Sequence, residues 1–193
     1  MKKILLSLIF TFFAIFSINS NTTVNTIFEG NVDAKIKLLV YESLTCSHCA
    51  NFHKDIYPKL KEDFVDKGLV KIEFRNFPLD MMAFNASKIA HCRNDGKSEI
   101  LHFLYDKQNE WVKGNTIEEV NSNLKKVLKD KKITLNFENC LKDISIENHI
   151  LEDRINGTKK YKVNSTPTII INDKKFDKPL TYKNLKKTLE KLI

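Results

Sequence analysis

Glycine and proline are scarce in this chain of 193 residues, which contains five glycines and four prolines. A low-complexity or disordered chain would be expected to carry more of both. No segment of the sequence repeats, and hydrophobic residues make up 42% of it, which is ample for a packed core. The length therefore predicts one globular domain with room for an insertion.

A basic patch interleaved with aromatic residues is also missing, although the formal net charge is +8. The lysines form short runs among acidic residues, at Lys125–Lys126, Lys129, Lys131–Lys132 and Lys159–Lys160. Such runs are typical of solvated helix faces and loops. We therefore predict no nucleic-acid partner.

Long hydrophobic runs are absent except at the N-terminus, where the run is short for a membrane span. Ile4–Ile18 is almost wholly apolar, follows Lys2 and Lys3, and is followed by polar residues. This pattern predicts a secretory signal peptide over residues 1–20. The residues before the expected cleavage site fit the preferred small-residue pattern only weakly, so an uncleaved membrane anchor is the alternative.

Cysteine is rare too, and two of the four cysteines stand close together. Cys46 and Cys49 enclose the motif CSHC, whereas Cys92 and Cys140 stand alone. An even number of cysteines in an exported chain suits an oxidising compartment. Cys46, Cys49 and His53 could supply three zinc ligands, but a structural zinc site needs a second close ligand pair, which the chain lacks. We expect no metal, which leaves a structural bridge or a redox-active pair.

The segments around the CSHC motif predict a strand, a helix and a second strand. Lys35–Glu42 is a continuous apolar run, as in a buried central strand. Ser47–Asp66 carries apolar residues at every fourth position, which predicts a helix that Pro58 should kink or break. Val70–Phe77 alternates between apolar and polar residues, as strands do. This order predicts a βαβ unit.

A long helical region is expected next. Its segments are Met81–His91, a helix that begins with the capping box Thr116–Glu119, a helix opened by Asn136, and Ile150–Ile155, which should end at Gly157. After it, Thr168–Ile171 predicts a short apolar strand that forms an antiparallel hairpin with the next few residues. A last helix is expected to start near Thr181.

The position of the CSHC motif suits redox chemistry. The motif follows a buried strand and opens a helix, where unpaired backbone N–H groups and the helix dipole favour negative charge. We therefore predict that Cys46 is the nucleophile and that Cys49, shielded one turn further in, is the resolving thiol. His48 can lend positive charge to the Cys46 thiolate, which would make the disulfide a stronger oxidant. The alternative is that His48 is only an exposed turn residue.

Three features in this order resemble the DsbA family of exported thiol–disulfide oxidoreductases: CSHC after a strand, a long helical insertion, and STPTIII before the third strand. The resemblance covers residues 24–193. It implies an α/β, thioredoxin-like fold, with a central mixed β-sheet flanked by helices and an inserted all-helical subdomain. We expect the thioredoxin-like domain at residues 21–77 and 163–193, and the inserted subdomain at residues 78–162.

The resemblance also implies roles for two residues before the third strand. In the family the corresponding proline is cis and lies against the active-site disulfide, which carries over to Pro167. Thr166 would offer backbone groups to an extended substrate peptide. The alternative is an ordinary trans proline at an edge strand.

The sequence departs from the family pattern in two places. Many thioredoxin-like proteins carry an acid six residues before the first cysteine, where this chain has Val40. Glu42 can take over that role in proton transfer, or it is a solvated carboxylate at the strand end. Ser47 stands where the best-known DsbA-like motif has proline, which leaves the redox potential open.

Cys92 and Cys140 both fall in predicted helices of the insertion. In an oxidising compartment we expect them to form a structural disulfide, and some DsbA-like relatives carry such a second pair. Closing a loop of this length is worth up to roughly 4 kcal/mol in the chain-entropy model. The alternative is two reduced core cysteines. His53, His102 and His149 are expected to be ordinary surface or core histidines.

The expected function is that of an exported protein dithiol oxidase, located in the periplasm or otherwise outside the cytoplasm. Its Cys46–Cys49 disulfide would pass to cysteine pairs of folding exported proteins, with no cofactor beyond that pair. A membrane, quinone-linked reoxidase of the DsbB kind would regenerate it, and the chain would be a monomer. The alternatives are a disulfide isomerase or reductase on the same fold, or a non-catalytic metal-binding or surface protein. Isomerases commonly add an N-terminal dimerisation domain, for which the short segment before the first strand leaves no room.

Overall fold

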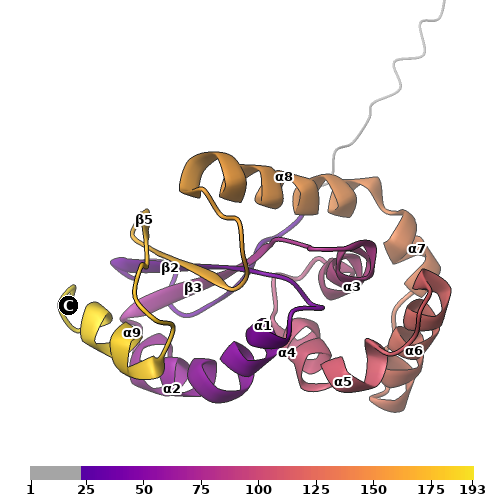
Figure 1. The fold of residues 1–193 in the computed structure, drawn as a ribbon, viewed down its shortest axis with the longest axis horizontal. Helices are drawn as coiled ribbons and strands as arrows, with labels where there is room; N and C mark the ends of the chain where they lie inside the picture. The colour runs from indigo at the N-terminus through magenta and orange to yellow at the C-terminus, as the bar shows by residue number, and fades with distance from the viewer. Residues whose placement is uncertain (1–22) are drawn as a thin grey trace, which may run out of the picture.

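The computed structural model describes residues 23–193 and shows a mixed sheet with helices on both faces (Figure 1). Side by side, the strands are β1 (Ile27–Glu29), β3 (Val70–Asn76), β2 (Ile36–Glu42), β4 (Thr168–Ile171) and β5 (Lys174–Lys175). β2 and β3 are parallel, and the other neighbours are antiparallel. The predicted βαβ unit, hairpin and central mixed sheet are therefore confirmed. The expected signal peptide lies outside the described residues.

The helix after β2 runs past Pro58. Turns of α- and π-helix alternate along it, as α1 (Ser47–Asn51), η1 (Phe52–Ile56), α2 (Tyr57–Leu60) and η2 (Lys61–Val65). Of the two predicted effects of Pro58, a kink or a break, the break does not occur. Proline lacks the N–H that a regular helix would use, and Pro58 stands in the first turn of α2, directly after the π turns of η1. Those wider turns supply the irregularity that the proline requires.

The remaining helices are α3 (Met81–His91), α4 (Glu99–Asp106), α5 (Gln108–Trp111), α6 (Ile117–Asp130), α7 (Phe137–Lys142), α8 (Ile144–Tyr161) and α9 (Tyr182–Leu189). Three of their predicted starts are confirmed. The Thr116 hydroxyl accepts from the Glu119 N–H, and the Glu119 side chain accepts from the Thr116 N–H, which completes the capping box. Asn136 caps α7 and Thr181 caps α9.

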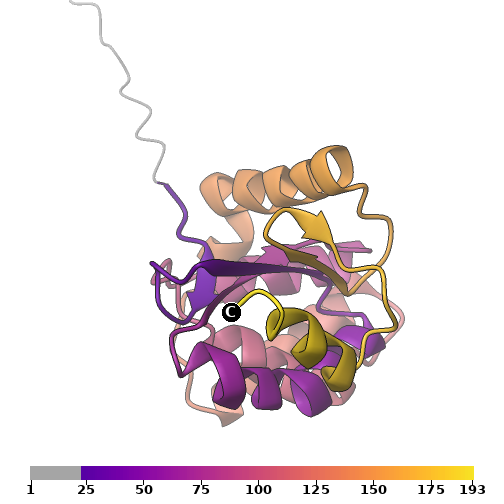
Figure 2. The same ribbon diagram turned by 90° about the vertical axis from the view of Figure 1, so that its left-hand side faces the viewer.

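α8 crosses one face of the sheet, whereas α1, α2 and α9 cover the other (Figures 1 and 2). The predicted helix end at Gly157 is wrong, because Gly157 lies inside α8. A Cβ atom there would stand 2.7 Å from Cε1 of Tyr41 on β2. Glycine is therefore needed for close packing of the helix on the sheet.

The side chains of β2 alternate between these two faces. Leu38 and Val40 belong to the main hydrophobic core, which includes residues of α1 and α2. Tyr41 belongs to a smaller cluster with Phe77, Val163 and Ile170. Glu42, two residues after Val40, accordingly shares the face that α1 covers.

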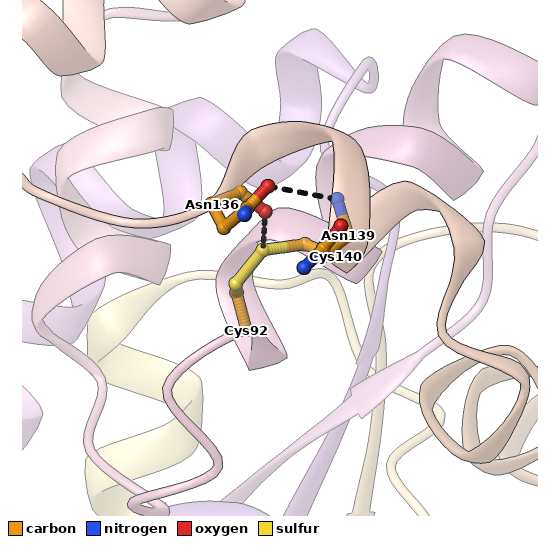
Figure 3. The surroundings of a disulfide bond; sticks show 4 residues. All are labelled: Cys92, Asn136, Asn139 and Cys140. Carbon is orange, nitrogen blue, oxygen red and sulfur yellow. Dashed lines mark hydrogen bonds between the residues drawn. A yellow bond between two sulfur atoms is a disulfide. The ribbon is translucent and has the colours of Figure 1, made fainter.

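A disulfide joins Cys92 to Cys140 and ties the end of α3 to α7 (Figure 3). Cys92 directly follows the last residue of α3, and Cys140 lies within α7. The side chain of Asn136 accepts a hydrogen bond from the Asn139 N–H and so caps the first turn of α7. The bridge thus links two elements of the helical region 48 residues apart in sequence.

We expect the double variant Cys92→Ala and Cys140→Ala to lose roughly 2–4 kcal/mol of unfolding free energy, because the unfolded chain is no longer closed into a loop. Urea unfolding of the variant and the unsubstituted protein, both with Cys46 and Cys49 oxidised, measures this. The double variant Cys46→Ala and Cys49→Ala, which keeps the Cys92–Cys140 bridge, is the comparison. An unchanged unfolding free energy would mean that Cys92 and Cys140 are reduced in solution.

Candidate active site

The CSHC motif lies where β2 gives way to α1. Cys46 is the N-cap residue of α1 and has extended backbone angles. Its carbonyl accepts hydrogen bonds from the N–H groups of Cys49 and Ala50, at 3.1 and 3.2 Å. Gln108 of α5 donates from Nε2 to the carbonyls of Leu44 and Cys46, at 2.8 and 3.0 Å. The turn that carries Cys46 is therefore fixed by backbone hydrogen bonds from α1 and by side-chain hydrogen bonds from α5.

The two cysteines are present as thiols and differ in exposure and acidity. Cys46 is half-buried, whereas Cys49 is fully buried. A hydrogen bond from the Cys49 side chain, aided by Thr166 and by the N–H groups of Cys49 and His48, lowers the pKa of Cys46 to about 5 against the opposing effect of burial. Burial raises the pKa of the Cys49 thiol far above its usual value. The pair thus combines an accessible thiolate with a buried protonated thiol.

His48 is exposed, and its contribution to the pKa of Cys46 includes a hydrogen bond from its backbone N–H. The effect of its imidazole on Cys46 stays a prediction.

The Thr166–Pro167 peptide bond is cis, as the family resemblance implies. The pairing of Tyr41 with Thr168 places this bond beside the end of β2 that leads into the CSHC motif. The carbonyl oxygen of Thr166 lies 3.4 Å from Sγ of Cys46. The loop before β4 thus forms one wall of the thiol site, and both Thr166 and Pro167 are only half-buried there.

Glu42 is buried, so the interpretation of a solvated carboxylate at the strand end is wrong. Its Oε2 lies 2.7 Å from Nε2 of His53. Its Oε1 has no hydrogen-bond partner among the described residues. Burial raises the pKa of Glu42 well above its usual value, and the charge of Cys46 adds to this. A buried carboxyl group whose ionised form is disfavoured therefore lies at the end of β2, four residues before Cys46.

A cleft of about 470 Å³ opens next to the first helix, between α1–α2 and the α4–α5 segment. Its lining includes Ala50, His53, Tyr57, His102 and Tyr105. The sequence predicts His53 and His102 to be ordinary surface or core histidines, whereas both line this cleft. The spacing of His53, one helical turn after Cys49, could have placed it near the motif. Nothing in the sequence places His102 there.

Among residues 23–193, no group of three or more His, Cys, Asp or Glu side chains is arranged to hold a metal ion. His53, the third residue of the zinc alternative, is instead hydrogen-bonded to Glu42 and His102. Within the same range, no helix is long and apolar enough to cross a membrane.

Comparison with known proteins places this site in a family. The thioredoxin family matches residues 22–191. A putative protein-disulfide oxidoreductase from Rickettsia bellii is 29% identical over 164 residues, covering 84% of this chain and 61% of the relative. Disulfide bond formation protein D from Bacillus subtilis is 29% identical over 171 residues, covering 84% of this chain and 74% of the relative. The chain therefore spans less than two thirds of the length of the Rickettsia relative.

Among solved structures, alpha-DsbA1 from Wolbachia pipientis superposes with a TM-score of 0.75 and 26% identity. The match covers 87% of this chain and 90% of that one. The expected thioredoxin-like fold is thereby confirmed. The chain belongs to the thioredoxin family, and within it is similar to DsbA-like disulfide oxidoreductases.

Proposed function

We propose that this chain is an exported dithiol oxidase that donates its Cys46–Cys49 disulfide to cysteine pairs of folding proteins. The observation that carries the proposal is the placement of the two thiols, with a half-buried Cys46 at the N-cap of α1 and a fully buried Cys49 one turn further in. This placement lowers the pKa of Cys46 and raises that of Cys49. Stabilising the Cys46 thiolate stabilises the reduced protein, so its disulfide accepts electrons readily. This favours net oxidation of substrates over isomerisation or reduction.

The reaction proceeds in two exchanges. A substrate thiolate attacks Sγ of Cys46 in the oxidised protein, which forms a mixed disulfide and releases Cys49 as a thiolate that takes up a proton. A second substrate thiolate then attacks the substrate sulfur of the mixed disulfide and releases Cys46 as a thiolate. The substrate gains a disulfide, and the protein keeps the two electrons as a dithiol. Thr166 and cis-Pro167 would hold the substrate as an extended peptide beside Cys46.

The partners follow from this cycle. Substrates would be unfolded or folding exported proteins that carry cysteines. The reduced protein must pass its two electrons on, and a membrane, quinone-linked reoxidase of the DsbB kind is the proposed acceptor. Export through an N-terminal signal and action as a monomer complete the proposal.

Titration of the reduced protein by ultraviolet absorbance tests this function. We expect the Cys46 thiolate to form with a pKa near 5, because the Cys49 thiol donates a hydrogen bond to it. Alkylation of Cys46 should accordingly stay fast at pH 7 and slow down only as the pH falls below about 5. In Cys49→Ala the pKa should rise, since that hydrogen bond is lost. A pKa near or above about 7 in the unsubstituted protein, as in thioredoxin, would rule out a strong oxidant.

The same titration of His48→Ala separates the two interpretations of this residue. If the imidazole lends positive charge to the thiolate, the pKa of Cys46 should rise in the variant. The backbone N–H of residue 48 remains in place, so its hydrogen bond does not contribute to the difference. An unchanged pKa would identify His48 as an exposed turn residue.

A further inference from the structure

Four side chains form a continuous chain of hydrogen bonds beneath the thiol site. Glu42 of β2 meets His53 of η1, with 2.7 Å between Oε2 and Nε2. His53 meets His102 of α4, with 2.9 Å between their Nδ1 atoms. His102 meets Glu29 of β1, with 2.8 Å between Nε2 and Oε1. None of these contacts is used by the exchange reaction as described above.

The chain runs from the interior toward solvent. The side chains of Glu42 and His53 are 3% and 4% exposed, whereas those of His102 and Glu29 are 26% and 17% exposed. His53 and His102 both line the 470 Å³ cleft. Solvent can therefore reach the outer end of the chain while the inner end stays dry.

The hydrogen bonds themselves fix where the protons lie. Glu29 is ionised, because hydrogen bonds from His102 and Ser98 outweigh the effect of burial and lower its pKa to about 2. Nε2 of His102 must then carry a proton, so in a neutral His102 Nδ1 accepts from Nδ1–H of His53. That leaves Nε2 of His53 without a proton, and Glu42 must be the donor. With both rings neutral, the geometry thus requires a protonated Glu42.

A second arrangement has the same number of protons. The Glu42 proton moves to Nε2 of His53, and the proton on Nδ1 of His53 moves to His102, which becomes an imidazolium between the neutral His53 ring and the Glu29 carboxylate. No heavy atom has to move. The four side chains can therefore pass a proton in either direction.

Stacking holds the two imidazole rings in position. His53 lies parallel to Tyr105, with 4.0 Å between ring centroids and 16° between ring planes. His102 lies on Tyr57 in the same manner, at 4.5 Å and 24°. Fixed rings keep both nitrogen atoms of each ring aligned with their partners, as proton transfer along the chain requires.

The exchange reaction needs a proton at the inner end. When substrate attacks Cys46, the buried Cys49 leaves as a thiolate, and its raised pKa means that it must be protonated. Glu42 acts electrostatically on Cys49 and is itself acted on by Cys46, but no hydrogen bond joins its carboxyl group to either sulfur atom. Its Oε1 is buried without a partner among the described residues, so a proton would pass from it to Cys49 through an intervening water molecule. Cys49 is fully buried, so bulk water cannot supply this proton directly. A group inside the protein has to donate it.

We propose that Glu42, His53, His102 and Glu29 form a proton relay that connects the buried Cys49 with the cleft. Glu42 gives its proton to the Cys49 thiolate and becomes a carboxylate. His53 then changes tautomer from Nδ1–H to Nε2–H, and Nδ1 of His102 takes a proton from water in the cleft. Passing the His102 proton to Nδ1 of His53 and the Nε2 proton of His53 to Glu42 restores the starting arrangement. In total, one proton enters at His102 and one S–H bond forms at Cys49. Electrons move only in the disulfide exchange. Reoxidation runs the relay in reverse.

Other titratable groups border both ends. Cys46, Cys49 and Tyr105 act on Glu42, and Tyr57 and Lys61 border Glu29. Burial raises the pKa of both tyrosines far above the pH range of the experiment below. Burial lowers the pKa of His53 to about 3, so this ring holds an extra proton only in passing. His102 is the more exposed of the two rings and meets water in the cleft.

Imidazole rescue tests the relay, which rests on the proposed redox cycle of Cys46 and Cys49. The rate measured is that of glutathione reduction of the oxidised full-length protein in dilute buffer, by acid quench and alkylation. We expect His102→Ala to be slower than the unsubstituted protein by about tenfold or more, within the range of general acid–base effects. Added imidazole, which fits the cleft, should restore the rate in proportion to its concentration. The solvent deuterium isotope effect should be larger in the variant.

His149→Ala is the matched control, since His149 lies in α8 and meets His91 edge-to-face, with no contact to the four relay residues. Its rate of reduction should match that of the unsubstituted protein and should not change when imidazole is added. If His102→Ala does not fold, His102→Gln serves instead, because an amide can still donate to Glu29 but cannot pass a proton on. A full rate in either His102 variant, or a slow rate that imidazole leaves unchanged in a folded His102→Ala, would overturn the relay alone. No reduction of the unsubstituted protein by glutathione would overturn the proposed function with it.

Discussion

Replacing Cys46 by serine is expected to abolish both dithiol oxidation and reaction with oxidised glutathione. The remaining thiol, Cys49, is fully buried, and burial keeps it protonated at neutral pH. Since the thiolate is the attacking species, ionisation alone should lower the rate by more than about a hundredfold relative to a thiolate with a pKa near 5. Mass spectrometry of the protein after timed exposure to oxidised glutathione measures this reaction.

Cys49→Ser is the informative comparison. It cannot form the Cys46–Cys49 disulfide and so cannot oxidise a dithiol, but its Cys46 still attacks oxidised glutathione. The resulting mixed disulfide should accumulate, because no resolving thiol remains to release it. Equal modification of Cys46→Ser and Cys49→Ser would mean that the two sulfur atoms do not have separate roles, and the proposed order of attack would be wrong.

The elements around the cysteine pair could be predicted because their patterns are local. A continuous apolar run predicts β2, alternation predicts β3, and side-chain caps predict the starts of α6, α7 and α9. β1 escaped prediction because it has only three residues, too few for a pattern to develop. Its pairing with β3 is nonetheless what brings Glu29 to the outer end of the relay.

Gly157 shows where a local rule fails. Glycine commonly ends a helix, and sequence alone offers no reason to place this one inside α8. The reason is the Tyr41 ring, more than one hundred positions away in sequence, against which the helix backbone packs. A contact between distant segments decided the structure here, and no local pattern carries that information.

The residues of the candidate site also fall into those that a local motif identifies and those that only contacts between distant segments bring together. Cys46, Cys49 and Pro167 could be identified because each stands in a short motif. The role of Glu42 could not be decided, because a carboxylate at a strand end is equally compatible with solvent and with burial. Only the packing of α4 over α1 and η1 buries it and brings His102 to His53. The residue type at position 40 then matters less, since position 42 supplies a buried carboxyl group on the same face of β2.

Asp153→Ala is expected to cause a large loss of stability, about 3 kcal/mol or more of unfolding free energy. The buried Asp153 carboxylate of α8 accepts hydrogen bonds from Arg75 at 3.0 Å and from both the backbone and side-chain nitrogen atoms of Asn76, at 3.0 and 2.8 Å. Alanine would take the Asp153 acceptor away from both Asn76 nitrogen atoms, would leave the Asn76 amide with His91 as its partner, and would leave Arg75 with only Glu73 as a counter-charge. Urea unfolding at neutral pH measures the loss.

Glu152→Ala provides the matched control for this substitution. It removes the same charge from the neighbouring position of α8, where the side chain is exposed, so its effect should stay within about 0.5 kcal/mol. The Asp153 contacts attach α8 to β3, and α8 covers the face of the sheet opposite α1 (Figures 1 and 2). A folded Asp153→Ala protein should therefore react with glutathione at an unchanged rate. Similar stability losses for the two variants would mean that the charge of α8, and not the buried contacts, attaches the helix. A slowed reaction in the folded variant would instead show that the two faces of the sheet are coupled, which the separate placement of Tyr41 and Glu42 argues against.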